Sequence, residues 1–329
     1  MGALDPIPNE GWREDRAPSG DAPATTRVLA FNTAVELAAY GLGDTWREAL
    51  DEAVDLCRAY ERLFSRTLPH SDIARLNAAQ GRPVPVDART HELLDAARRY
   101  CAASEGAFDV TVGPLVRLWD FHAGVEPTDQ ALAEAAAHVD WHALELGEGD
   151  ADAPGRFWAR LADPRAAVDV GGIAKGWMAD RLVEALLARG AAGAMVNLGG
   201  NVAVAGSKPD GAPWRIGIRD PRRPHDPDAL LGAVPLAAGS AVTSGVYERC
   251  FTAPDGRLLH HVLDPRTGRP VDTDVAGVTV VAPRSLDAEG FSTTLLALGL
   301  ERGTALARSR PEITQAFFVT PDGEVTSAW

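Results

Sequence analysis

Cysteine is scarce in this sequence and is poorly placed for chemistry. The three cysteines, Cys57, Cys101 and Cys250, lie far apart, and none belongs to a Cys-x-x-Cys pair. Disulfide frameworks and zinc sites use paired or closely spaced cysteines, so this spacing argues against both. We therefore expect buried free thiols of a reducing compartment.

Long apolar runs are also absent. No stretch of 18 apolar residues occurs, so no membrane span is predicted. Residues 1–27 are rich in proline, glycine and charge, with neither the apolar core of a signal peptide nor a lipid-attachment cysteine. The sequence predicts a flexible tail over residues 1–27, one domain over residues 28–329, no membrane anchor and a cytoplasmic location.

Positive charge is in deficit. Lysine and arginine number 32 against 46 acidic residues, which gives a net charge of −14. This balance argues against binding to nucleic acid or to an anionic membrane surface. An anionic ligand would need a local cationic pocket. Only two lysines, Lys175 and Lys208, are present, and arginine supplies the other cations.

Several common nucleotide and hydrolase motifs are missing. The sequence contains no G-x-G-x-x-G, no G-x-x-x-x-G-K-[ST], no H-E-x-x-H and no G-x-S-x-G. Dinucleotide-binding Rossmann domains, P-loop proteins, zinc proteases and α/β-hydrolases therefore lose support.

Residues 168–180 form the clearest candidate for a binding site. They are predicted to be a short β-branched strand, a turn at Gly171 and Gly172, and the start of a helix that runs to about Arg189. Glycines at such a turn let a ligand approach the backbone, and helix N–H groups favour an anion. Lys175 gains nothing from the helix dipole, which suggests a negative ligand. The alternative is a turn that only lets the helix pack on the sheet.

The order of elements favours an α+β fold. Residues 28–40 are predicted to form a strand, and Thr45 with Glu48 forms a capping box for the next helix. Apolar residues recur at helical spacing from residue 46 to residue 64. Later segments with clear patterns are two predicted helices at 90–103 and 286–300 and two predicted strands at 214–219 and 275–282. Because strict strand–helix alternation is missing, we expect mixed or antiparallel sheets flanked by helices.

The helix predicted at residues 286–300 carries a candidate metal face. Glu289 and Thr293 are four residues apart, so their oxygens can lie on one side of the helix, with Asp287 nearby. Oxygen ligands of this kind suit Mg²⁺. The alternative is a solvated helix face.

Two histidines and an aspartate are further candidates. His260 and His261 adjoin on a predicted strand, so they should point to opposite faces, one into the core and one toward a cleft. The cleft histidine could serve as a hydrogen-bond donor or general base. Purely structural histidines are the alternative. Asp109 follows a glycine turn, where it could bind a ligand or only stabilise the turn.

Taken together, these segments resemble the ApbE-type family of FAD:protein FMN transferases. The matching pieces are Phe64, Ser65, Ser71, Asn77, residues 106–109 (Gly-Ala-Phe-Asp), 169–176 (Asp-Val-Gly-Gly-Ile-Ala-Lys-Gly), 197–200 (Asn-Leu-Gly-Gly), 243–245 (Thr-Ser-Gly), 261–268 (His-Val-Leu-Asp-Pro-Arg-Thr-Gly) and the helix at 289–299. They occur in the family's order over about nine tenths of the chain. Each piece is modest alone, and the ordered set is specific.

The resemblance implies an α+β fold related to the T-fold, with FAD bound in a cleft. The residues that it implies for FAD binding are Ala107, Phe108, Asp109, Asp169, Lys175, His261 and Val262. Of these, His261 would lie beside the transferred FMN phosphate, and His261 and Lys175 are assigned to catalysis. A Mg²⁺ ion would be held by the backbone carbonyl of Gly172 and by the side chains of Glu289 and Thr293.

The implied reaction moves FMN from FAD to a Ser or Thr hydroxyl of an acceptor flavoprotein and releases AMP, with Mg²⁺ and a cation neutralising the pyrophosphate. The chain departs from the family at four positions. Glu289 replaces the usual Asp, Val246 stands where an Asp often occurs, and Phe31 and Thr67 replace a common Met and Tyr. The alternatives are a protein that binds FAD without chemistry and a pyrophosphatase that releases FMN and AMP.

Overall fold

The computed structural model describes residues 7–149, 156–226 and 228–329. The helices are α1 (Trp46–Phe64), α2 (Asp72–Ala78), α3 (Ala88–Ala103), α4 (Gly113–Val116), α5 (Asp129–Ala136), α6 (Ala174–Ala188) and α7 (Ser285–Ser309). The strands are β1 (Arg13–Arg16), β2 (Ala24–Ala30), β3 (Thr33–Tyr40), β4 (Val84–Val86), β5 (Leu144–Glu148), β6 (Phe157–Leu161), β7 (Gly193–Leu198), β8 (Asn201–Gly206), β9 (Trp214–Arg219), β10 (Leu230–Leu236), β11 (Gly239–Gly245), β12 (Cys250–Thr252), β13 (Leu258–His260), β14 (Gly277–Ala282), β15 (Gln315–Val319) and β16 (Val325–Ser327). Within the described ranges no helix is long and apolar enough to cross a membrane.

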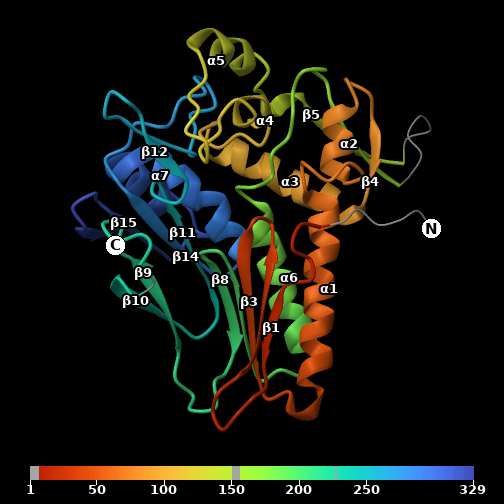
Figure 1. Ribbon diagram of the computed structural model, residues 1–329, viewed down its shortest axis with the longest axis vertical. Coiled ribbons are helices and arrows are strands. Elements are labelled where there is room, and N and C mark those ends of the chain that lie inside the picture. Colours follow the sequence, from red (N-terminus) through yellow and green to blue (C-terminus); the bar gives the residue numbers. More distant parts are fainter. Residues whose placement is uncertain (1–6, 150–155, 227) are drawn as a thin grey trace.

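A nine-stranded sheet organises the molecule. Its strand order is β1-β2-β3-β7-β8-β11-β14-β15-β16, and every neighbouring pair is antiparallel. Helices α1 and α6 run roughly along the β1 and β3 strands, and α7 packs on β11 and β14 (Figure 1). Helix α6 also contacts α1 and α7, so it lies between them. This mixture of helices and antiparallel sheets confirms the expected α+β class.

Helix α1 shows why this packing forms. Leu50, Ala53, Cys57, Tyr60 and Phe64 are all buried, and their spacing places them along one side of the helix. The rings of Tyr60 and Phe64 meet the fully buried Trp177 of α6 edge-on. The predicted apolar stripe of α1 is therefore confirmed as its contact with α6.

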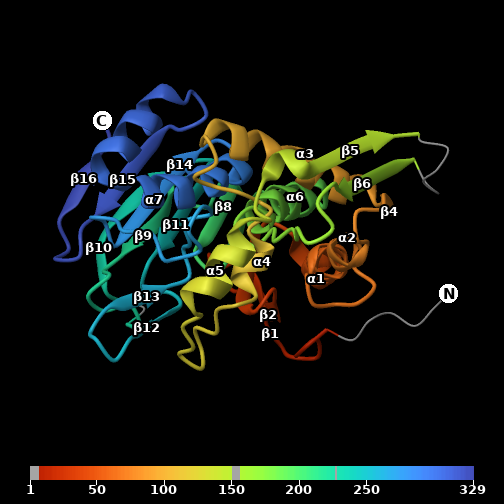
Figure 2. The same cartoon turned by 90° about the horizontal axis from the view of Figure 1, so that it is seen from above.

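Two smaller units flank the main sheet. The β9–β10 hairpin packs on strands of the main sheet through Ile218, Val234, Ala241, Val281 and Val319. In the view from above, α4 and α5 lie beside the β12–β13 hairpin (Figure 2), and they share a separate apolar cluster with it. That hairpin leads directly into His261, so this cluster helps to place one wall of the site.

The N-terminal third differs from the prediction in three places. Strand β1 pairs with β2, which begins at Ala24, so residues 13–16 and 24–27 belong to the sheet and the expected tail over 1–27 is wrong for them; residues 1–6 lie outside the described ranges. The strand predicted at 28–40 is a hairpin, because Phe31 and Asn32 adopt positive φ values of 52° and 57° and reverse the chain.

The third difference concerns the start of α1. Thr45 makes no capping bond with its side chain; its hydroxyl donates instead to the carbonyl of Leu42 at 2.8 Å. The predicted capping box is therefore wrong. The expected free thiols are confirmed, with Cys57 and Cys101 buried and Cys250 partly exposed.

Candidate functional site

The Gly171–Gly172 turn is held by contacts from distant segments. Asn77 of α2 donates its amide to the carbonyl of Val168 at 2.9 Å and accepts the Val168 N–H at 2.7 Å. The Asp169 N–H donates to the carbonyl of Val110 at 2.9 Å. These contacts replace a strand ladder, so the short strand predicted here is wrong, whereas the helix predicted after the turn is confirmed as α6.

The turn is further shaped by Asp169 and Phe108. The carboxylate of Asp169 accepts the N–H of Gly171 at 2.8 Å and pairs with Arg66 at 3.2 Å. A Cβ atom at Gly172 would lie 3.1 Å from the ring of Phe108, so the glycine lets the turn pass close beside that ring. The loop at residues 107–109 and the glycine turn therefore form adjoining parts of one site.

Glu289 of α7 is the buried charge at the centre of the site. It is 3% exposed, and its carboxylate accepts hydrogen bonds from the ammonium of Lys175 and from the backbone N–H of Gly176. The amide of Asn201 donates to the same carboxylate at 3.3 Å. The alternative, a solvated helix face, is therefore wrong for Glu289.

Gly176 makes this contact possible. A Cβ atom there would lie 2.5 Å from the carbonyl oxygen of Ser285 and 2.9 Å from the Cβ of Glu289. Helices α6 and α7 can therefore approach closely only because residue 176 lacks a side chain. The N–H groups of the first turn of a helix lack intrahelical partners, and Glu289 satisfies one of them from the neighbouring helix.

The remaining oxygen groups of the proposed metal face are hydroxyls. Ser244 of β11 lies 2.8 Å from the hydroxyl of Ser292 and 3.3 Å from that of Thr293, so Thr293 does lie near the site. Asp287 does not join them, because it accepts a hydrogen bond from Tyr100 and thus faces α3. Among the described residues no group of three or more His, Cys, Asp or Glu side chains could hold a metal ion, so a metal here would need hydroxyl and carbonyl oxygens beside the carboxylate of Glu289.

The two histidines have different environments. His260 is 5% exposed and His261 is partly exposed, and the Nδ1 atoms of both lack a hydrogen-bond partner. Although His261 is partly exposed, its Nδ1 atom is enclosed, and this burial of the ring lowers the pKa of His261 to about 4, with further lowering by the positive charges of Arg249 and Lys175. The imidazole of His261 is therefore neutral at neutral pH and can accept a proton.

The loop at residues 107–109 is rigidly built. The buried carboxylate of Asp109 accepts the N–H and hydroxyl of Thr111, both at 2.7 Å, and the N–H of Trp141 at 3.1 Å. Burial raises the pKa of Asp109, and these hydrogen bonds oppose the rise. Asp109 thus fixes the loop through its side chain, while Ala107 faces a cavity.

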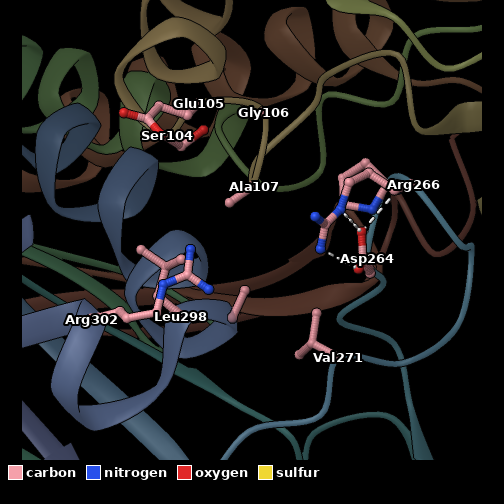
Figure 3. Close-up of a pocket in the computed structure, with 11 residues that line it drawn as sticks. Ser104, Glu105, Gly106, Ala107, Asp264, Arg266, Val271, Leu298 and Arg302 are labelled. Carbon is pink, nitrogen blue, oxygen red and sulfur yellow. Dashed lines mark hydrogen bonds and ion pairs between the residues drawn. The ribbon is translucent and has the colours of Figure 1, made fainter.

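That cavity has a volume of about 220 Å³ and lies between the loop, the turn at residues 264–266 and α7. In the close-up, Arg266 folds back onto Asp264, while Arg302 and Leu298 approach from α7 (Figure 3). Glu289, Thr293 and Ala297 follow at four-residue spacing, and Ala297 lines the cavity. The cavity therefore continues the Glu289–Thr293 side of α7.

Four other positions named from the sequence have contacts of their own. Val262 is buried, and its carbonyl accepts the N–H of Val271 at 3.0 Å. Phe31 lies in the β2–β3 turn, where its N–H donates to Glu61 at 2.7 Å. Thr67 is exposed beside Ser65, and Val246 is partly buried at the end of β11. In the part of the chain that the structure describes, none of these four residues makes a hydrogen bond or ion pair with Lys175 or Glu289.

The sequence analysis assigned no individual role to three polar residues of the site. Arg66 pairs with Asp169, Asn201 contacts Glu289, and Arg302 lines the cavity. Arg66 follows the Phe64–Ser65 pair, and Asn201 follows the Asn-Leu-Gly-Gly segment. Both residues therefore adjoin segments that resemble the family, which could have indicated them. Arg302 had none, because it lies beyond the kink in α7 at Gly299.

Comparison with known proteins identifies the family. A family model described as the ApbE family matches residues 31–318. The FAD:protein FMN transferase of Treponema pallidum is 37% identical over 292 residues, which cover 85% of this chain and 79% of that protein. The FAD:protein FMN transferase of Escherichia coli K12 is 30% identical over 278 residues, which cover 82% of this chain and 76% of that protein.

Solved structures of the same family have the fold of this chain. The ApbE protein of Thermotoga maritima superposes with a TM-score of 0.82 at 28% identity, covering 92% of this chain and 96% of that one. The flavinyl transferase ApbE of Pseudomonas stutzeri, in its apo form, superposes with a TM-score of 0.78 at 30% identity, and the match covers 95% of each chain. The names of these relatives agree with the transferase class expected from the sequence. With a family model that spans most of its length and relatives of this similarity, the chain belongs to the ApbE family.

Proposed function

We propose that this protein is a Mg²⁺-dependent FAD:protein FMN transferase that moves FMN from FAD to a Ser or Thr hydroxyl of an acceptor flavoprotein and releases AMP. The observation that carries the proposal is the contact of the Lys175 ammonium with Glu289 and with the Gly171 carbonyl at the glycine turn, with the neutral His261 near enough for the Lys175 charge to lower its pKa. These groups come from three separate segments, and their joint presence suits a diphosphate with a cation. The names of the relatives support the same activity.

In this proposal FAD lies across the adjoining parts of the site. Ala107 lines the cavity, the ring of Phe108 lies beside the glycine turn, and Asp109 holds this loop in place. The diphosphate would lie at that turn, near the N-terminus of α6 and the ammonium of Lys175, where a negative charge is stabilised. Asp169 keeps the turn in shape through Gly171. Val262 supports the position of His261.

The residues proposed to hold Mg²⁺ fit that ion by chemistry. The carbonyl of Gly172, the carboxylate of Glu289 and the hydroxyl of Thr293 are all oxygen donors, which Mg²⁺ prefers. A cation is already accepted here, since the Lys175 ammonium contacts both the Gly171 carbonyl and Glu289. When bound, Mg²⁺ would supply positive charge to the diphosphate oxygens.

The transfer step follows from the same residues. The acceptor oxygen forms a bond to the FMN phosphorus, and the bond from that phosphorus to the bridging oxygen breaks, so AMP leaves with the bridging oxygen. His261 takes the proton of the attacking hydroxyl, which its neutral state allows. The pKa of about 4 applies to the protein without substrate, and a nearby diphosphate would raise it toward a useful value. Lys175 would stabilise the charge on the phosphate oxygens.

The test follows both products. The protein is incubated with FAD, Mg²⁺ and an acceptor flavoprotein; mass spectrometry then weighs the acceptor while chromatography measures AMP and free FMN. We expect one FMN on the acceptor and one AMP per transfer. Release of AMP and free FMN with an unmodified acceptor would favour a pyrophosphatase. If neither AMP nor FMN is formed, the protein only binds FAD. Lys175→Ala should lose turnover, whereas Lys208→Ala, a change of the other lysine, should keep it.

A further inference from the structure

The Glu289 carboxylate is a buried charge with one cationic partner among the described residues. It is 3% exposed, and its recorded contacts are the Lys175 ammonium, the Gly176 N–H and the Asn201 amide. An unpaired carboxylate in such a position is strongly disfavoured, so the carboxylate needs a cation whenever it is ionised. Lys175 meets that need here.

The ammonium of Lys175 also contacts a second oxygen. It donates to the carbonyl of Gly171 at 3.1 Å as well as to Glu289. A backbone carbonyl and a carboxylate are the oxygen ligands that a divalent cation takes. The lysine side chain is 27% exposed, so a flexible and partly solvated stem carries the charge into this position.

We infer that Lys175 is the resident counter-ion of Glu289 and that a divalent cation binds by taking its place on the carboxylate. Lysine and metal then occupy the same carboxylate in turn. This inference rests on the metal site of the proposed function and deepens it by assigning Lys175 a second state.

The exchange gives Lys175 two sequential roles. Before the metal binds, its ammonium keeps the buried carboxylate paired and the start of α6 fixed to α7. After exchange, the ammonium is released from Glu289 beside the glycine turn and becomes available to phosphate oxygens of the substrate. The cost of breaking the Lys175–Glu289 pair is then part of every metal-binding event, so the wild-type protein binds metal more weakly than its oxygen ligands alone would allow.

Direct measurement of metal binding tests the exchange without any turnover. Mn²⁺ serves as the probe, and its free concentration is read from its electron paramagnetic resonance signal as protein is added, with FAD absent. Lys175→Met should bind Mn²⁺ about ten-fold more tightly than wild type, because no ammonium has to leave. Lys175→Arg keeps a cation and should bind no more tightly than wild type. Lys208→Met is the matched control and should behave as wild type.

Two further variants keep the test decisive if Lys175→Met is unstable. Glu289→Gln and the double variant Lys175→Met/Glu289→Gln remove the buried charge, and both should bind Mn²⁺ far more weakly than Lys175→Met. The thermal midpoint of Lys175→Met should rise more on addition of Mn²⁺ than that of wild type, because the metal binds its folded state more tightly.

The inference is overturned if Lys175→Met binds Mn²⁺ no more tightly than wild type, or if Glu289→Gln leaves the affinity of Lys175→Met unchanged. Failure of the proposed function has a different signature, namely no FMN on the acceptor from the wild-type protein. The Mn²⁺ affinities are read independently of that outcome, so the two failures can be told apart.

Discussion

Gly176→Ala tests whether the close approach of α6 and α7 sets up the site. The added methyl group would lie 2.5 Å from the carbonyl oxygen of Ser285 and 2.9 Å from the Cβ of Glu289. Ser285 cannot easily move away, because Asp180 of α6 accepts the N–H groups of Ser285 and Leu286 at 2.6 and 3.0 Å. The methyl group must therefore push the helices apart against these bonds.

The expected loss of stability combines three effects. Overpacking of a well-filled contact costs about 1–3 kcal/mol. Weakening the hydrogen bond from the Gly176 N–H to the Glu289 carboxylate adds about 1.5–3 kcal/mol, since the acceptor is charged. Alanine is a better helix former than glycine, which stabilises the folded variant by about 1 kcal/mol. We expect a net loss of about 1.5–5 kcal/mol in the free energy of unfolding, together with weaker pairing of Lys175 and Glu289.

Urea denaturation, followed by tryptophan fluorescence, measures this change, provided that the slope with urea stays the same. Gly232→Ala is the control, because Gly232 lies exposed in β10 and an added Cβ has no atom within 4 Å; its effect should stay within about 0.5 kcal/mol. If Gly176→Ala is as stable as wild type, the helices have room for a side chain, and the argument that glycine creates the Glu289 contact is refuted.

Three further predictions concern charged groups of the site. Arg66→Ala should weaken FAD binding about three- to ten-fold but leave riboflavin binding unchanged, because the exposed Arg66 guanidinium beside Asp169 would recognise phosphate. Fluorescence titration measures both affinities, and equal losses for the two flavins would contradict this role. Glu289→Ala should reduce Mg²⁺-dependent turnover by about 100-fold, whereas Glu289→Asp should retain it. Full activity of Glu289→Ala, or activity that is insensitive to a chelator, would contradict the assignment of Glu289 as a metal ligand. The pKa of His261 is lowered to about 4 from 6.5. Between these two pH values the unfolded chain therefore binds more protons than the folded protein. The free energy of unfolding should fall by about 1–3 kcal/mol as pH drops from 6.5 to 4. His261→Asn should lose this part of the acid sensitivity in denaturation at a series of pH values, and an unchanged pH profile would contradict the assigned burial.

Local patterns were sufficient where neighbouring residues decide the conformation. The apolar stripe of α1 and the start of α6 after two glycines were both predicted and are both present. The predicted strand at residues 214–219 is β9. In each case the hydrogen bonds lie within the element or its hairpin partner, so the sequence pattern carries the necessary information.

The prediction failed where a distant residue supplies the hydrogen bonds. Val168 belongs to a β-branched run, yet its backbone pairs with the side chain of Asn77 rather than with a strand. Phe31 interrupts an apolar run with a positive φ, and Glu61 of α1 accepts its N–H. Asp287 was expected near the metal face of Glu289, but residues two apart on a helix point to opposite sides, and Asp287 accepts a hydrogen bond from Tyr100 of α3. No local rule includes these partners.

The sequence by itself determined the family, the α+β class and the residues of a candidate site, because ordered motifs and periodicity are properties of the linear chain. It also placed Lys175 at a helix start where a cation gains nothing from the dipole. Only the tertiary structure decided what that charge contacts. Lys175 and Glu289 are 114 positions apart, and they meet because α6 and α7 pack closely at Gly176. Burial then turns the contact into a strong requirement for a cation, since a carboxylate removed from water must be paired.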